Sequence, residues 1–442
     1  MPVQMTEARA ARLTGGFDGG NGYVKAKLRG EVDGAEVIDQ VDLPSVVSSE
    51  NRSMPKVPLE DSTAAEVLAD PDFYNRIECS IQSPLVSRTD LKTFGRKALT
   101  TPGKLTQFEV FGPHSKADQE LSFILVLGVF AAKALRDYVA EHGVLPAHEL
   151  RTSVRAGLAL PITEYVQRRH GFAADFTGPA AAPATHLVTL KMFNTPVPVR
   201  LTFEAVHVLA EGASAQFAIT NKGEVLARAL LDDLRHSDPE GHARLAAQGI
   251  SAADLVAVQN TIGVDAGEGT TNFPAYSEGR FNPAASSTLD QGFGTVLENA
   301  MEAMREARPP LVFGSRKELA DFLQQEPSKF TRAKHERARG FVDDQAEYLC
   351  EEIASAFGDV LAQAGSATDV VYVYGGGSGP IAKFLRPKLQ QIAGDIPVLY
   401  LDARYSRHLN REGLYIAARH VEQAAGKEPA PATGAAKDQN AA

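Results

Sequence analysis

Two glycine-rich turns with the same residue pattern constrain this 442-residue sequence more than any other feature. Each follows an apolar segment and reads Asp-x-Gly-x-Gly, first from Asp18 and again from Asp265. The residues after each turn alternate between apolar and polar, which is typical of a strand. A dinucleotide-binding turn would lead into a helix instead, and the sequence contains no GxxxxGK[ST] motif. The repetition therefore predicts a duplicated architecture with two facing phosphate-binding hairpins.

The first turn contains the groups that hold phosphates in glycine-rich loops. Gly20 and Gly22 allow backbone amides to approach an anion, and Asn21 adds a side-chain amide. Lys25 reaches the same phosphates as a positive charge. Asp18 ends the preceding strand, where a carboxylate suits a water-mediated contact with Mg²⁺. Taken alone, this turn is equally compatible with an ordinary hairpin.

The second turn offers the same chemistry: a carboxylate for metal or water, backbone amides, and hydroxyl donors for phosphate. These groups belong to Asp265, Gly267, Glu268, Gly269, Thr270 and Thr271. A third glycine turn, 375–378, follows an apolar strand and leads into a helix, with Pro380 near the first helical turn. Its members Gly375, Gly376, Gly377 and Ser378 would let a flat base and a ribose lie on the backbone. A structural turn is the alternative here, but the three turns in this order favour nucleotide binding.

Charge and cysteine content narrow the possible functions. The chain carries 45 Lys plus Arg and 55 Asp plus Glu, so its net charge is −10 and a broad direct contact with DNA is disfavoured. The basic cluster at 332–339 is better explained as a solvated helix face. Cys79 and Cys350 form no CxxC pattern, as expected in a reducing cytoplasm. The sequence contains no transmembrane stretch and no secretory signal, so we expect a cytoplasmic protein without a membrane contact.

The three turns resemble the nucleotide-binding motifs of the actin-like ATPases. Asp18, Gly20, Gly22 and Lys25 match the phosphate 1 pattern DxGxGxxK, and the turn from Asp265 to Thr271 matches the phosphate 2 pattern DxGxGxT. The turn at 375–377 is similar to the adenosine motif. Within this superfamily, the segments 43–45, 95–99 and 160–165 resemble the ParM/StbA-type bacterial proteins of plasmid partition. The resemblance covers roughly residues 14–423.

This resemblance implies an actin-like, ribonuclease H-like duplicated α/β fold, in which two lobes enclose a nucleotide cleft. The expected organisation is a flexible N-terminus (1–13), domain I (14–222 plus 411–423, with subdomain IB at 45–118), a helical insertion (223–258), domain II (259–410, with subdomain IIB at 306–365) and a disordered tail (424–442). We expect a long apolar helix over residues 119–142. The helical insertion at 223–258 is open to two interpretations: it is either a surface decoration or an assembly contact.

The resemblance also implies roles for individual residues. Asp18 and Asp265 would organise Mg²⁺ through water, while Lys25 and the turn amides would hold the phosphates of ATP or ADP. Glu211, in a segment that resembles the family's strand-to-helix turn with a catalytic acid, would orient or activate the attacking water; an ordinary first-turn helix acid is its alternative. Glu268 is longer than the residue usual at its position, and Asn21 stands where actin has a serine.

The function implied is that of a polymerising ATPase. ATP binding would favour assembly into a homopolymeric filament, hydrolysis would loosen it, and the filament would move plasmid DNA through a DNA-binding adaptor protein. Two alternatives remain open on the same fold: a small-molecule kinase, which would need a base for a substrate hydroxyl, and a nucleotide switch that does not polymerise. A chaperone is disfavoured because no substrate-binding β domain follows the last helix, and a direct DNA-binding protein is the least favoured.

Overall fold

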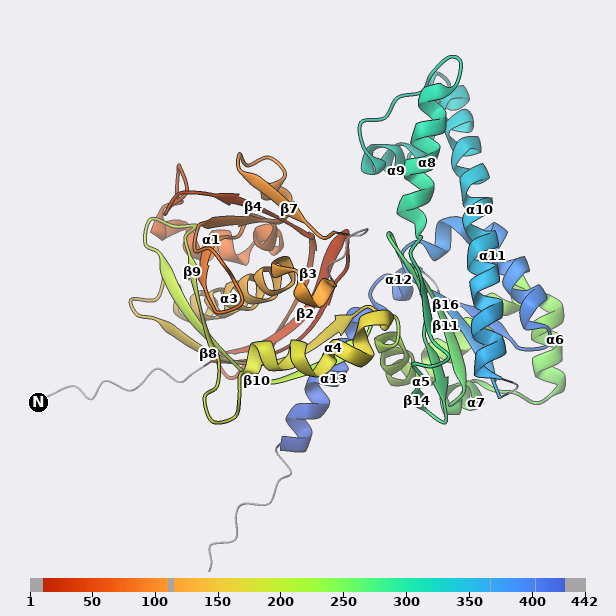
Figure 1. Cartoon of the computed structure of the whole chain (residues 1–442), viewed down its shortest axis with the longest axis horizontal. Coiled ribbons are helices and arrows are strands. Elements are labelled where there is room, and N and C mark those ends of the chain that lie inside the picture. The colour runs from red at the N-terminus through yellow and green to blue at the C-terminus, as the bar shows by residue number, and fades with distance from the viewer. Residues whose placement is uncertain (1–10, 110–114, 366, 402, 426–442) are drawn as a thin grey trace, which may run out of the picture.

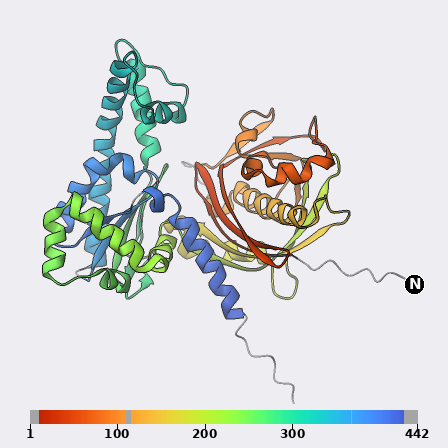
Figure 2. The same cartoon turned by 180° about the vertical axis from the view of Figure 1, so that it is seen from behind.

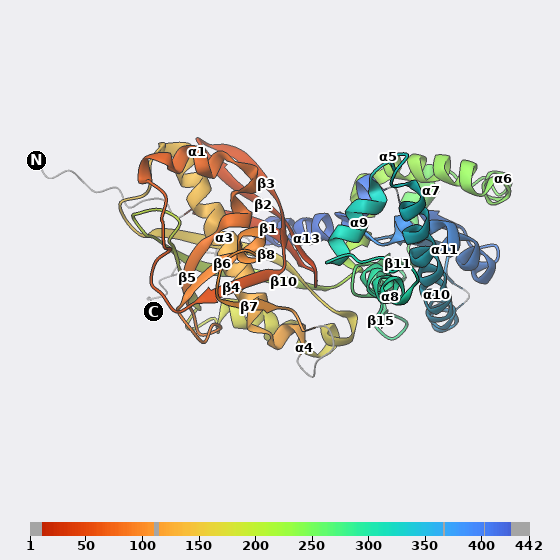
Figure 3. The same ribbon diagram turned by 90° about the horizontal axis from the view of Figure 1, so that it is seen from above.

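Two β-sheets, one in each half of the chain, organise the computed structural model, which describes residues 11–109, 115–365, 367–401 and 403–425. Figure 1 shows them as two lobes side by side, with the first sheet curled around helix α3 (Glu120–His142). In the view from behind, helix α13 (Leu409–Ala425) runs between the lobes (Figure 2). The view from above separates the lobes along the long axis of the molecule (Figure 3).

The first sheet has ten strands in the order β3-β2-β1-β8-β10-β9-β5-β6-β4-β7. Their bounds are β1 (Ala11–Gly19), β2 (Tyr23–Val32), β3 (Ala35–Pro44), β4 (Val46–Glu50), β5 (Glu78–Gln82), β6 (Leu91–Phe94), β7 (Lys104–Gln107), β8 (Leu150–Leu160), β9 (Thr185–Leu190) and β10 (Val197–Ala210). Helices α1 (Ala64–Ala69), α2 (Gly95–Ala98), α3 and α4 (Ile162–Thr177) belong to this lobe, with short 3₁₀ turns at 61–63, 71–76 and 116–118.

The second sheet has seven strands, of which the central β11 (Thr261–Ala266) pairs with β12 (Thr271–Phe273), β13 (Ala275–Ser277) and β16 (Val370–Tyr374). The other strands are β14 (Arg280–Phe281), β15 (Ser287–Leu289) and β17 (Val398–Tyr400). The helices are α5 (Ser214–Ser237), α6 (Pro239–Ala247), α7 (Ala252–Ala257), α8 (Phe293–Glu306), α9 (Arg316–Gln324), α10 (Arg332–Ala364), α11 (Ser378–Ala393) and α12 (Ala403–Ser406). In Figure 1, α8, α9 and one end of α10 project from this lobe as an arm.

The two sheets repeat one connectivity. In the first lobe, β1 pairs antiparallel with β2 and parallel with β8, and β8 pairs parallel with β10. In the second lobe, β11 pairs antiparallel with β12 and β13 and parallel with β16, and β16 pairs parallel with β17. Each lobe is thus a hairpin followed by two parallel strands, as the repeated Asp-x-Gly-x-Gly turns predicted.

Helix α3 is the centre of the first core. Its bounds match the helix expected over 119–142, and it ends at Gly143, which adopts the left-handed conformation (φ 74°) that favours glycine. Leu125, Leu127 and Phe130 are completely buried against the curled sheet. Residues 121–132 are apolar on every side of the helix except at Ser122, so this part has to be enclosed, because water on any side would meet apolar surface.

The segment 223–258 forms a structural layer of the second lobe. Helix α5 bends at Gly223 (φ 59°), and α6 and α7 continue the layer. Leu230 and Leu255 share one buried cluster with Tyr372 and Leu399 of the second sheet. The segment is therefore more than a surface decoration, because its apolar stripe covers one face of the sheet.

Helix α13 returns the chain to the first lobe through close backbone contacts. A Cβ atom at Gly16 of β1 would lie 2.7 Å from the carbonyl oxygen of Arg411, and one at Gly157 of β8 would lie 2.8 Å from the carbonyl carbon of Leu414. A Cβ at Gly413 would lie 2.5 Å from the carbonyl carbon of Ser214 at the start of α5. Glycine at these places lets the helix lie directly against both lobes.

The ends of the chain differ slightly from expectation. Strand β1 already begins at Ala11, with Leu13 buried, so part of the predicted flexible N-terminus is a strand. Helix α13 continues to Ala425, two residues into the predicted disordered tail. The remainder of both predicted segments lies outside the described residues. Every helix in the described part of the chain is too short or too polar to cross a membrane.

Candidate functional site

The predicted site residues gather where the parallel strands of both lobes end. Asp18 lies at the end of β1, Glu211 directly after β10, and Asp265 at the end of β11. The third glycine turn begins at Gly375, directly after β16. The carboxyl ends of parallel strands are the common ligand-binding edge of α/β sheets. Here two such edges, one from each lobe, meet at the same cleft.

The first turn is braced by the residue that follows β3. The Ser45 hydroxyl donates to the Gly20 carbonyl (2.6 Å), and the Ser45 amide donates to the Gly22 carbonyl (3.0 Å). Ser45 is buried, so these hydrogen bonds are shielded from water. The turn is therefore held by the Leu-Pro-Ser segment at 43–45, one of the segments that resemble the ParM/StbA-type proteins.

The second and third turns are joined to each other. The Gly377 amide donates to the Ala266 carbonyl (2.8 Å), and the Gly267 amide donates to the Thr270 carbonyl (2.9 Å). Gly375 has φ 94°, and a Cβ there would lie 2.8 Å from the Ala266 carbonyl carbon. Only glycine fits at Gly375, because the left-handed backbone and the close approach both exclude a side chain.

The first and second turns face each other across the cleft. A Cβ at Gly22 would lie 2.8 Å from the Glu268 carboxyl carbon, so the glutamate side chain lies against the opposite turn. Glu268 also pairs with Arg316 at the start of α9 (3.5 Å), and Arg316 reaches Glu298 (3.9 Å). The two hairpins thus face each other, as the sequence predicted.

The carboxylates of Asp18, Glu211 and Asp265 lie close enough to influence one another's charge. Burial raises the pKa of Asp18 above its ordinary value; Lys25 opposes the shift, Glu211 adds to it, and Lys116 and Arg411 also oppose it. Burial likewise raises the pKa of Asp265 to about 6, opposed by a hydrogen bond from Asn410 and increased by the charge of Asp18. Carboxylates drawn from both lobes therefore act on one another electrostatically, and such clusters are typical of functional sites.

Asn410 connects this cluster to the junction of the lobes, and no sequence motif predicted it. Its amide donates to Asp265 (2.7 Å), and its side-chain oxygen accepts the Ser214 hydroxyl (2.9 Å). Asn410 lies on α13, which packs against β1 of the first lobe. One side chain thus joins the central aspartate of the second lobe to the helix that runs between the lobes.

The turn that carries Glu211 is fixed by the second lobe. The Tyr374 hydroxyl donates to the Gly212 carbonyl (2.9 Å), and the Tyr276 hydroxyl donates to the Ala213 carbonyl (2.7 Å). The Glu211 carboxylate forms an ion pair with Lys116. Lys116 was not predicted, because its surroundings in the sequence show no regular pattern.

Two predicted hydroxyl groups are turned away from the cleft. Thr271 is completely buried and donates its hydroxyl to the Gln291 carbonyl (2.9 Å). Ser378 is buried and donates to the Gly375 carbonyl of its own turn (2.9 Å). In this arrangement both hydroxyls stabilise the turns. Thr270 is half-buried, and its hydroxyl stays a predicted phosphate donor.

The residue types at this site are those that bind a nucleotide and its metal ion. At Gly376 of the third turn a Cβ would meet no atom within 4 Å, so open space lies beside that turn, and Lys25 supplies a cation beside the first turn. Asp18 and Asp265 are the oxygen donors that Mg²⁺ prefers. Among the residues described, no three His, Cys, Asp or Glu side chains are grouped as direct metal ligands.

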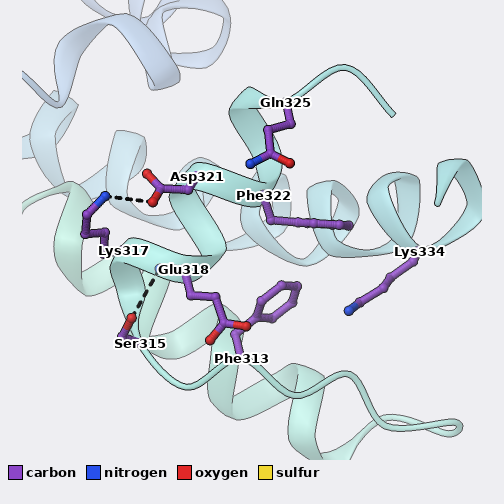
Figure 4. Close-up of a pocket in the computed structure, with 8 residues that line it drawn as sticks. All are labelled: Phe313, Ser315, Lys317, Glu318, Asp321, Phe322, Gln325 and Lys334. Carbon is purple, nitrogen blue, oxygen red and sulfur yellow. Dashed lines mark hydrogen bonds and ion pairs between the residues drawn. The ribbon is translucent and has the colours of Figure 1, made fainter. Parts of the chain in front are cut away.

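A separate hollow lies on the arm of the second lobe, around helix α9 (Figure 4). It has a volume of about 490 Å³ and is lined by Phe313, Ser315, Lys317, Glu318, Asp321, Phe322, Gln325 and Lys334. Lys334 lies over the rings of Phe313 and Phe322, at 4.9 and 5.1 Å from their centroids. The hollow contains none of the predicted site residues.

Comparison with solved structures identifies the fold. The chain superposes on the actin-like protein Alp7A with a TM-score of 0.59 at 15% identity, covering 94% of this chain and 99% of that one. Ta0583, an archaeal actin homolog, gives 0.57 at 12% identity (92% and 99% covered), and Bacillus thuringiensis ParM with ATP gives 0.56 at 16% identity (93% and 99%). No protein-family model and no curated protein matches the sequence. The chain has the two-lobed actin-like fold, which confirms the predicted fold and, as a likeness of structure, the predicted resemblance to ParM.

Proposed function

We propose that this protein is an ATPase whose nucleotide state controls its assembly into an actin-like filament. The observation that carries the proposal is the meeting of Asp18, Glu211 and Asp265 from two lobes beside Lys25 and three glycine turns. The likeness to ParM with ATP supports it, since that protein binds ATP in the same fold.

The residues divide the chemistry between them. Lys25 and the amides of the first two turns hold phosphates, and the third turn supports the base and ribose. Asp18 and Asp265 would hold Mg²⁺ through water, and the metal would neutralise phosphate charge. Glu211 orients the attacking water and accepts its proton. Phosphoryl transfer depends mainly on positioning and charge stabilisation, and these residue types supply both for ATP hydrolysis.

Assembly follows from the two-lobed design. A nucleotide that contacts turns from both lobes favours the closed arrangement, and a filament contact that fits only this arrangement would depend on the nucleotide. Head-to-tail contacts of identical subunits grow into open filaments when the rotation between subunits does not close. We further propose that the filament acts in the cytoplasm and moves DNA through an adaptor protein, since a net charge of −10 disfavours direct DNA contact.

The test is light scattering with high-speed pelleting in ATP, a non-hydrolysable ATP analogue, ADP and no nucleotide. We expect pelleting with ATP that decays as ATP is consumed. In Glu211→Ala we expect pelleting to persist and phosphate release to fall at least a hundredfold, because the water is no longer oriented. Absence of assembly in every nucleotide, with nucleotide binding intact, would refute the filament and favour a switch that does not polymerise.

A further inference from the structure

The ion pair between Lys116 and Glu211 is the feature of the cleft that the proposed function leaves unexplained. Both side chains are largely buried, with exposed fractions of 9% for Lys116 and 14% for Glu211. Burying two charges is unfavourable unless the pair is well made, so an ion pair of this kind adds little stability by itself. Its position next to the predicted hydrolytic carboxylate suggests a role other than stability.

The backbone of Lys116 is clamped in place. The amides of Lys116 and Ala117 donate to the Glu164 carboxylate of α4 (2.8 and 3.1 Å), and the Lys116 carbonyl accepts the Ser122 hydroxyl (2.7 Å). The ammonium lies 5.4 Å from the centre of the Phe108 ring. A fixed backbone with a flexible four-carbon side chain lets the ammonium change partner without moving the fold.

The ammonium lies within the electrostatic field of the cleft. Lys116 and Lys25 both oppose the rise in the pKa of Asp18, so both lysines act on the carboxylate at the start of the first turn. Glu211 acts on Asp18 and on Asp265. Lys116 is therefore next to the place where Asp18, Asp265 and Glu211 converge.

We propose that Lys116 senses the terminal phosphate and thereby controls when Glu211 is available. Without that phosphate the ammonium occupies the Glu211 carboxylate. When the terminal phosphate enters, its larger negative charge attracts the ammonium, and a Glu211 oxygen becomes free to accept a proton from water. This inference rests on the proposed function, and it adds a residue that distinguishes ATP from ADP.

The experiment compares equilibrium binding of a non-hydrolysable ATP analogue with binding of ADP, by equilibrium dialysis at fixed Mg²⁺. In Lys116→Met we expect affinity for the analogue to fall about tenfold or more, because the hydrogen bond between the ammonium and the charged terminal phosphate is lost. ADP affinity should change less than about twofold. Lys116→Arg should retain most of the preference for the analogue, since it keeps the charge.

A matched control is Lys92→Met. Lys92 is also buried and also pairs with a carboxylate, Asp90 at 2.6 Å, but it lies on β6, in the other half of the ten-stranded sheet. We expect the ratio of the two affinities to stay as in the parent. Equal losses for both nucleotides in Lys116→Met would overturn the inference, because a purely structural lysine affects both alike.

A second variant tests the exchange of partners directly and does not require Lys116→Met to fold. In Glu211→Gln the ammonium loses its charged partner, so affinity for the ATP analogue should rise severalfold while ADP affinity stays unchanged. An unchanged preference in Glu211→Gln would refute the exchange. If the parent bound neither nucleotide, the proposed function would fail together with this inference; if it binds both and neither variant alters their ratio, only this inference fails.

Discussion

Gly413→Ala should destabilise the protein, although the same change elsewhere in a helix stabilises it. A Cβ at position 413 would lie 2.5 Å from the Ser214 carbonyl carbon, whereas ordinary contacts are 3.4–4 Å. Helix α13 would have to retreat by roughly an ångström, and its other face is held against the backbone of β1 and β8. Leu409 and Leu414, both almost completely buried, would lose contacts.

The expected magnitude is the difference of two effects. Overpacking against rigid backbone costs about 3 kcal/mol, at the upper end of the usual range. Replacing glycine with alanine in a helix returns about 1 kcal/mol. The free energy of unfolding should therefore fall by about 2 kcal/mol. The matched control is Gly340→Ala in α10, where a Cβ would have no atom within 4 Å, so stability should rise by about 1 kcal/mol.

The assay is urea unfolding followed by far-ultraviolet circular dichroism, with parent and both variants measured side by side. The midpoints should move in opposite directions. Because both variants make the same chemical change in a helix, helix propensity alone would move both midpoints upward. A Gly413→Ala midpoint equal to or above that of the parent would refute the close contact between α13 and α5.

Further predictions concern buried polar groups. Burial raises the pKa of Asp137 to about 6, above that of an unfolded aspartate, so the stability gained from its protonation is lost as the pH rises through 6. Lys133→Met removes the cation that lies 2.6 Å from Asp137, so the free energy of unfolding should fall by about 3 kcal/mol at pH 8 and clearly less at pH 5, where Asp137 is protonated. Urea unfolding at both pH values measures the difference. Asn410→Ala removes the amide that donates to Asp265, so Mg²⁺-ADP should bind several-fold more weakly by calorimetry, and unchanged binding would contradict the role of that bond. Ser45→Ala should lower stability by about 1 kcal/mol and raise the KM for ATP more than it lowers kcat, because it loosens only the first turn.

The local features of the molecule were predictable because they depend on neighbouring residues. A turn that reads Asp-x-Gly-x-Gly between alternating segments permits few conformations other than a hairpin, so both hairpins were predicted correctly. The strongly apolar composition of 119–142 likewise predicted α3. The side-chain directions of Thr271 and Ser378 could not be predicted, because their partners come from the packing around each turn.

The residue types and their order predicted the chemistry of the cleft: which residues carry carboxylates, amides and cations, and that two similar hairpins hold them. Which of these charges meet depends on how distant segments pack. Lys116 and Glu211, and likewise Asn410 and Asp265, are far apart in the chain and are brought together by strand order and by the path of α13. The helices within 223–258 were predictable from their local sequence pattern. Their packing against one face of the second sheet was not, because the strands that they cover come much later in the chain. Local backbone preferences act over a few residues, whereas these pairings arise from burial shared between distant segments.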